Sequence, residues 1–137
     1  MKFFAIVILP KGTDETDAKQ VEQAASSLMQ PFKMWEDDVP VENGQWDYYW
    51  CCSREWMEES RISYFAYKGI PESQPLVVFP VAHLSNEGIT DSIVTPTGEW
   101  HRSKATYEEE DPSWDAKASG ILRAFPGHFG VLAYCHG

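Results

Sequence analysis

The sequence is poor in basic residues and in cysteine. It contains 11 Lys and Arg against 21 Asp and Glu over 137 residues, which gives a formal net charge of −10. Because nucleic-acid backbones and anionic membranes attract Lys and Arg, this balance argues against direct binding to either. The three cysteines are an odd number with two adjacent members, which is not the pattern of a secreted disulfide framework. The chain is therefore expected to work in the cytoplasm.

The sequence also lacks a long hydrophobic segment and a glycine-rich loop. Its longest early apolar run, Phe3 to Leu9, is too short to span a membrane and is followed by Pro10. A secretory leader needs a longer apolar core and a small-residue cleavage site, so neither a leader nor a membrane anchor is predicted. The phosphate-loop patterns GxGxxG and GxxxxGKS/T are missing, which argues against nucleotide binding through such a loop.

The acidic excess is concentrated in two stretches. Residues 36–59 contain eight acids and one arginine, residues 105–137 have a net charge of −3, and the rest of the chain is neutral. One interpretation is a set of solvated loops with an exposed helix face. The other is an acidic surface that competes for the basic groove of a partner, as a nucleic-acid mimic would.

Aromatic residues are plentiful, with six Trp, six Tyr and seven Phe. Strand alternation places Trp46, Tyr48 and Trp50 on one face. It places Asp47 and Tyr49 on the other. One set is expected to fill the core, and the other can form a patch that, with a nearby arginine, holds a flat ligand or an arginine-rich partner.

Hydrophobic periodicity predicts one α+β domain over residues 1–137. Apolar runs at 3–9 and 129–135 indicate buried strands. One helix is expected to start at Thr13 or Asp14 and stop at Pro31, and a second to start at Asp111-Pro112 and stop at Pro126-Gly127. The residues between are expected to form strands at 46–52, 61–67, 76–81 and 89–101, and the last of these ranges is expected to be a hairpin. A short helix is expected at 54–60 and a loop at 32–47. This order predicts an antiparallel sheet with two helices on one face, a ferredoxin-like or related sandwich with the terminal strands central.

Patterns for catalysis or metal binding are weak. The histidines His83, His101, His128 and His136 are far apart, and no HxxxH or CxxC pair occurs. Cys51 or Cys52 beside Arg54 offers a thiol next to a positive charge, but the surrounding aromatic run is more typical of packing. No metal or cofactor is predicted. A small His- or Cys-dependent hydrolase that uses His101 or His136, with or without a metal held by these histidines and a middle cysteine, is kept as an alternative.

Several stretches resemble a family of small uncharacterised proteins from bacteriophages and actinobacteria. That family has an apolar first strand, a helix ending near Pro-Tyr or Pro-Phe, and a W-D-W-Y-x-I-G-G-R-W segment. A D-G-x-W strand, an acidic stretch, a helix ending in L-P and a last strand closing on D-C-H follow. The matching stretches here are Phe3 to Leu9, Pro31-Phe32, Trp46 to Trp50 with Arg54 and Trp56, Thr97 to Trp100, Asp111 to Trp114, Ala124 to Pro126 and Tyr134 to His136. The resemblance implies a phage or prophage setting and a common fold.

The chain differs from that family at two places. Cys52-Ser53 replaces the Gly-Gly that would allow close backbone approach to a ligand. Tyr134 replaces the Asp before the terminal Cys-His, so a carboxylate that orients His136 is expected to be missing.

Together these features predict a non-enzymatic, phage-borne protein that acts in the cytoplasm of the host bacterium. It would inhibit a host defence component, as anti-CRISPR proteins do, by binding a host protein with a basic surface. The expected contact residues are Glu36, Asp37, Asp38, Trp46, Tyr49, Arg54, Glu58 and Glu59.

A second class of function is a sponge for a nucleotide defence signal. In that alternative, a Trp or Tyr stacks on the base and Arg54 binds a phosphate. The pocket would be lined by Trp50, Trp56, Trp100, His101 and His136. The number of aromatic residues is also compatible with a homodimer.

Overall fold

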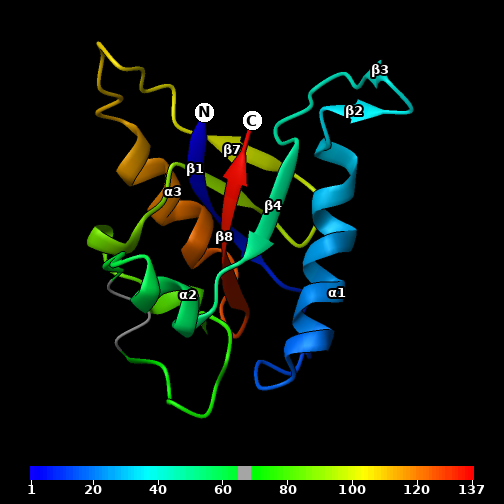
Figure 1. Ribbon diagram of the computed structural model, residues 1–137. Coiled ribbons are helices and arrows are strands. Elements are labelled where there is room, and N and C mark those ends of the chain that lie inside the picture. Colours follow the sequence, from blue (N-terminus) through cyan, green and yellow to red (C-terminus); the bar gives the residue numbers. More distant parts are fainter. Residues whose placement is uncertain (65–68) are drawn as a thin grey trace.

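The computed structural model describes residues 1–64 and 69–137 (Figure 1). Its helices are α1 (Ala18–Met29), α2 (Arg54–Glu59) and α3 (Trp114–Arg123). Its strands are β1 (Lys2–Ile8), β2 (Trp35–Glu36), β3 (Val39–Pro40), β4 (Tyr48–Cys51), β5 (Val78–Pro80), β6 (Ser92–Val94), β7 (Trp100–Arg102) and β8 (Phe129–His136). Short 3-10 turns cover Gln30–Phe32, Val81–His83 and Asn86–Gly88. In the described residues no helix has the length and apolar character that a membrane crossing requires.

The main sheet has the strand order β4-β8-β1-β6-β7, and β5 pairs with β8 beyond the end of β4. Neighbouring strands are antiparallel except β1 and β6, which are parallel. The predicted α+β class with a mostly antiparallel sheet is confirmed, and the two terminal strands lie at its centre as expected. Both carry continuous apolar runs because a central strand with two covered faces needs apolar residues at every position.

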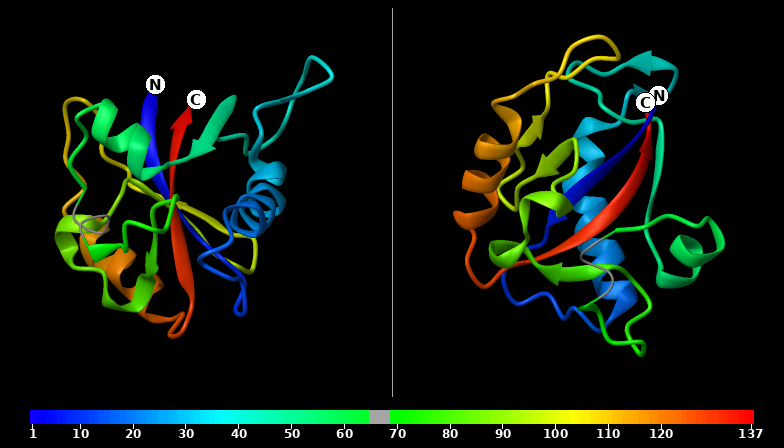
Figure 2. Two further views of the ribbon diagram at one scale, coloured as in Figure 1. Left: turned by 60° about the horizontal axis from the view of Figure 1, so that its bottom comes forward. Right: turned by 90° about the vertical axis from the view of Figure 1, so that its left-hand side faces the viewer.

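The helices cover both faces of the sheet, so the prediction that they share one face is wrong (Figures 1 and 2). Val21, Ala25 and Met29 of α1 pack with the odd-numbered side chains of β1. Trp114, Ala118 and Leu122 of α3, with Met57 of α2, pack with Ile6 and Ile8 on the opposite face. Since β1 is apolar on both faces, each face of the sheet requires helices that cover it. The ferredoxin-like arrangement, in which both helices lie on one face, therefore does not apply.

Both long helices begin later than the sequence predicts. α1 starts after Asp17, whose carboxylate accepts from the Gln20 N–H at 3.2 Å, and α3 starts after Ser113. The expected caps instead close local turns: Asp14 accepts from Thr16, and Asp111 accepts from Ser113. An Asp followed two residues later by Ser or Thr favours such a turn over a helix cap.

The middle of the chain largely forms the predicted elements. β4 and α2 fall within their expected ranges, and the hairpin of β6 and β7 ends one residue beyond its range, at Arg102. β5 with its proline forms a short outer strand. Of the strand expected at 61–67, residues 61–64 are not in a strand and 65–67 lie outside the described residues.

The loop predicted at 32–47 contains a small hairpin of β2 and β3. Asp37 and Asp38 form its turn, with φ of 49° and 63°. Two residues with positive φ are what a tight two-residue hairpin turn requires.

Candidate binding face

The even-numbered side chains of three strands lie in rows across one face of the sheet. In the register of β1, β8 and β4, Phe4 pairs with Tyr134, which pairs with Trp50. In the next row Lys2 and Tyr48 flank His136. The following row, which includes Ile6 and Leu132, is buried beneath the helices. The first two rows therefore bring six side chains from distant parts of the sequence to one end of the face.

Ring contacts join these rows into one cluster, which we call the aromatic face: Phe4, Tyr48, Trp50, Trp56, Tyr134 and His136. Tyr48 stacks on His136 with 4.8 Å between ring centroids and an interplanar angle of 3°. Trp50 stacks on Tyr134 at 5.0 Å and meets Trp56 edge-on at 5.4 Å. Phe4 meets Tyr134 edge-on at 5.3 Å. Offset and edge-on contacts of this kind are the favourable arrangements for aromatic rings.

The helix α2 delivers Trp56 to this cluster. Ser53 caps the helix, because its hydroxyl accepts from the Trp56 N–H at 3.0 Å. Met57 points into the core, and Glu58 and Glu59 remain exposed. The short helix therefore holds one aromatic ring against the sheet and displays carboxylates next to it.

The aromatic face is partly open to solvent. Tyr48 is 44% exposed and Trp50 is 37% exposed, whereas the other four rings have intermediate burial. A contiguous exposed apolar patch on a small protein is typical of an interaction site. A cavity of about 340 Å³ opens beside Phe4, between the start of β1 and the segments 62–64 and 87–91.

Asp47 orients His136 at the rim of this face. The Asp47 Oδ1 lies 2.7 Å from Nδ1 of His136, and the Asp47 N–H donates to the His136 carbonyl at 2.7 Å. The expectation that no carboxylate orients His136 is therefore wrong: the carboxylate comes from a segment 89 residues away. The hydrogen bond with His136 lowers the pKa of Asp47.

The His136→Ala variant tests this contact. We expect the pKa of Asp47 to rise toward its ordinary value of 3.8 once the hydrogen bond is lost, measured by carboxyl NMR titration. Folding lowers the pKa of Asp47, so the contact stabilises the folded protein fully above pH 3.8. This stabilisation is lost as the pH falls through the lowered pKa that Asp47 has in the folded protein. Asp14, whose pKa is lowered by Thr16, is the internal control and should not move. An unchanged Asp47 pKa in the variant would contradict the assignment.

Trp46 does not belong to the exposed aromatic set. It is only 7% exposed, its indole N–H donates to the Met29 carbonyl at 2.8 Å, and its ring meets Tyr49 edge-on at 4.8 Å. The predicted role as a partner anchor is wrong for this buried side chain. The chain bends at Asp47, so the alternation expected from 46 to 50 holds only from Tyr48 onward, and Trp46 joins the α1 side of the sheet.

Two other predicted anchors have structural contacts. Tyr49 packs against the α1 side of the core, and burial raises the pKa of its hydroxyl. The Arg54 guanidinium donates to the Ile70 carbonyl and so ties α2 to the segment before β5. Neither side chain is part of the aromatic face.

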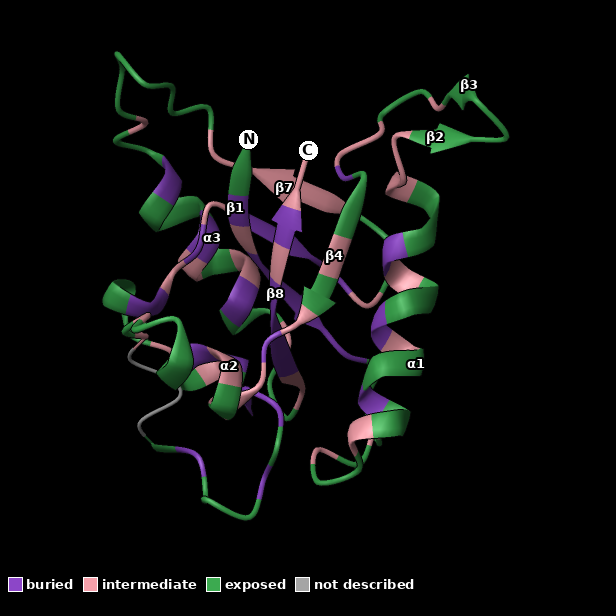
Figure 3. Ribbon diagram, viewed as in Figure 1, coloured by how far each residue is buried: buried purple, intermediate pink, exposed green. Residues whose placement is uncertain are grey.

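The acidic stretch 36–59 does not form one surface. Glu36, Asp37 and Asp38 lie on the β2–β3 hairpin, which projects beyond the end of α1 (Figures 1 and 2). Glu58 and Glu59 lie at the end of α2, across the sheet from that hairpin in both figures. Figure 3 shows that both places are exposed. Of this stretch, Asp47 contacts His136 of the aromatic face, and Glu58 and Glu59 follow Trp56 on α2.

The residues of the alternative ligand pocket are also separated. Trp50, Trp56 and His136 share the aromatic face, but Trp100 packs against Phe3 and Phe32 on the α1 side. His101 lies on β7, at the opposite edge of the sheet from β4. The five residues therefore do not line a common pocket.

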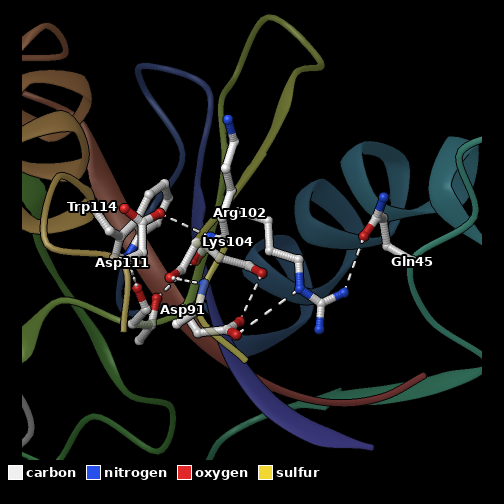
Figure 4. A network of polar contacts seen from close by, with 10 residues as sticks. Gln45, Asp91, Arg102, Lys104, Asp111 and Trp114 are labelled. Carbon is white, nitrogen blue, oxygen red and sulfur yellow. Dashed lines mark hydrogen bonds and ion pairs between the residues drawn. The ribbon is translucent and has the colours of Figure 1, made fainter. Parts of the chain in front are cut away.

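Arg102 and Trp114 make structural contacts near that opposite edge (Figure 4). The Arg102 Nη1 donates to Gln45 Oε1 at 3.2 Å, and its Nε lies 3.9 Å from Asp91 Oδ2. The indole N–H of Trp114 on α3 donates to the Thr90 carbonyl at 2.8 Å. These contacts attach β7 to the start of β4 and α3 to the start of β6.

The cysteines are placed for packing. Burial raises the pKa of Cys51 and of Cys135 to about 12 and raises that of Cys52 as well. A nucleophilic thiol needs a lowered pKa, so the geometry does not support a cysteine nucleophile. Among the described residues no three His, Cys, Asp or Glu side chains are grouped so that they could hold a metal ion.

Sequence reasoning missed Phe4 and Tyr134 as site residues. The sequence predicts a buried strand for each of them, and a continuous apolar run gives no reason to expect that one end of the strand is exposed. The available signal was the polar or charged residue two positions away in each strand, Lys2 and His136, because these share a face with Phe4 and Tyr134. Comparisons with models of protein families, with curated proteins and with solved structures gave no match for this chain.

Proposed function

We propose that the protein is a binding protein that uses the aromatic face to hold a partner protein with cationic side chains. The observation that carries this proposal is the cluster of six rings with Tyr48 and Trp50 exposed at its centre. Arg and Lys side chains bind favourably over the faces of Trp and Tyr rings, and binding energy concentrates on such aromatic residues. In the phage setting that the resemblance implies, the partner is proposed to be a host defence component.

The charges beside the aromatic face support a basic partner. Glu58 and Glu59 follow Trp56 by two and three residues on α2, and both are exposed. Asp47 lies at the other end of the face beside His136. With a net charge of −10 on the whole chain, these carboxylates would attract and orient a positively charged surface.

The test is capture of host proteins by the immobilised chain and by two matched charge-reversal variants. In the first, Glu58 and Glu59 are both changed to Lys; in the second, Glu108 and Glu109, an exposed acidic pair outside the face, are changed in the same way. We expect the first variant to bind the captured basic protein about tenfold more weakly in 0.1 M salt, and the second to bind it like the parent chain. The difference should shrink at higher salt, where screening is stronger.

Two results would contradict the proposal. One is equal binding by both variants and the parent chain. The other is release of an intact nucleotide from the denatured protein, detected by mass spectrometry, with no salt-sensitive protein partner. The second result would favour the sponge alternative.

A further inference from the structure

The strand β4 forms an open edge of the main sheet. It is the first strand in the order β4-β8-β1-β6-β7, and its partner β8 lies on one side of it. The Cys52 N–H donates to the Leu132 carbonyl at 2.8 Å, and Cys51 faces Ala133 in the register. This bond points the Cys52 N–H toward β8. Because the N–H and C=O groups of successive strand residues alternate in direction, those of Cys51 and Tyr49 point away from β8. Within the described residues no hydrogen bond is found from these outward groups.

A groove runs along this open edge. It has a volume of about 350 Å³ and lies between β4 and α1, lined by Tyr49, Trp50 and Cys51 on the strand and by Glu22 and Ser26 on the helix. Figures 1 and 3 show α1 standing beside β4, with its outward residues exposed. The helix therefore forms one wall, and the outward backbone groups of the strand form the other.

The edge strand lacks the residue types with which proteins usually prevent strand pairing. The sequence Tyr48-Tyr49-Trp50-Cys51 contains no Lys, no Pro and no Gly. Its aromatic residues have high β-propensity. An exposed edge of this kind is suited to accept a further strand.

We propose that β4 accepts an extended segment of the partner protein as an added strand of the sheet. This inference rests on the proposed function and names how the partner binds. Main-chain hydrogen bonds to Tyr49 and Cys51 would supply affinity, and alternate side chains of the added strand would face the two sides of the sheet. One set lies toward Tyr48 and Trp50, and the other enters the groove, where the Glu22 carboxylate favours a Lys or Arg.

The charge of the chain decides between a partner segment and a second copy of this protein. Pairing of two β4 edges would bring together two chains with a net charge of −10 each. Like-charge contact opposes that association. A basic segment is attracted by the same negative charge, so the added strand is assigned to the partner protein.

The experiment uses a defined probe. It is an eight-residue peptide that alternates Arg and Val and is blocked at both ends. The matched control is the same peptide with a methyl group on every backbone nitrogen, which keeps every charge but leaves no backbone N–H to donate to a neighbouring strand. We expect the parent peptide to protect the Tyr49 and Cys51 amides from hydrogen–deuterium exchange by tenfold or more, and the methylated peptide to leave them unchanged. Equal binding of both peptides without protection would overturn the inference.

Two variants at Cys51 separate the contribution of its backbone N–H to peptide binding from that of its thiol. Of the backbone groups, Cys51→Pro removes only an N–H that points away from β8, so the ladder hydrogen bonds with β8 are retained. Cys51→Ala removes the thiol and keeps the N–H. We expect the Pro variant to bind the peptide at least tenfold more weakly than the Ala variant, with both folds verified by circular dichroism. Equal peptide binding by the two variants would overturn the inference. The proposed function is tested separately, by the partner binding of the variant with Glu58 and Glu59 reversed.

Discussion

Trp46→Ala is expected to destabilise the protein by about 3–5 kcal/mol, the range for removing a buried Trp. The side chain is enclosed by Met29, Tyr49 and the C-terminal end of α1, and its indole N–H satisfies the Met29 carbonyl. The truncation leaves a cavity and an unpaired carbonyl at the same place. Urea unfolding followed by circular dichroism measures this loss.

Trp35→Ala is the matched control for that measurement. Trp35 lies on the β2–β3 hairpin and is exposed, so its removal is expected to change the free energy of unfolding by less than about 0.5 kcal/mol. A Trp46→Ala protein that keeps the stability of the parent chain would show that Trp46 is not part of the core, and would return it to the list of partner anchors.

Trp50→Ala is expected to weaken partner binding by about 2 kcal/mol or more, which is about 30-fold. Trp50 contacts Tyr48, Trp56 and Tyr134, so it is the central ring of the aromatic face. Its removal takes away contact area and also loosens the neighbouring rings. Titration of the captured partner by isothermal calorimetry, with unfolding measured in parallel, separates loss of binding from loss of fold.

Tyr107→Ala is the control for the loss of an exposed aromatic residue. Tyr107 is fully exposed in the loop before α3 and makes no ring contact among the described residues. We expect it to leave partner binding within about twofold of the parent chain. If Trp50→Ala and Tyr107→Ala bind the partner equally well, the aromatic face is not the binding site.

Much of the fold follows from local patterns. The continuous apolar runs of β1 and β8 identify them as central strands, and Pro80 identifies a short outer strand because proline removes a ladder donor. The side of the sheet on which each helix packs is not a local property. It depends on how the chain crosses between strands, and here both faces of β1 need a cover.

The candidate site is less readable from the sequence. The charge excess of residues 36–59 is plain in the sequence, yet the hairpin with Asp37 and the helix with Glu58 lie on different sides of the sheet. Trp46 and Trp50 look alike in sequence and have opposite burial, because the bend at Asp47 changes which face each one takes.

The composition and the order of residues in the sequence are enough to determine three things about this protein. These are its acidic balance, its α+β class and its excess of aromatic residues over what a small core needs. Tertiary structure alone decided which aromatic residues meet. Phe4, Trp50 and Tyr134 come together through strand register across β1, β4 and β8, and Asp47 reaches His136 over 89 residues. The physical reason is that strand pairing joins segments without regard to their distance in sequence, so contacts across the sheet leave no local pattern to read.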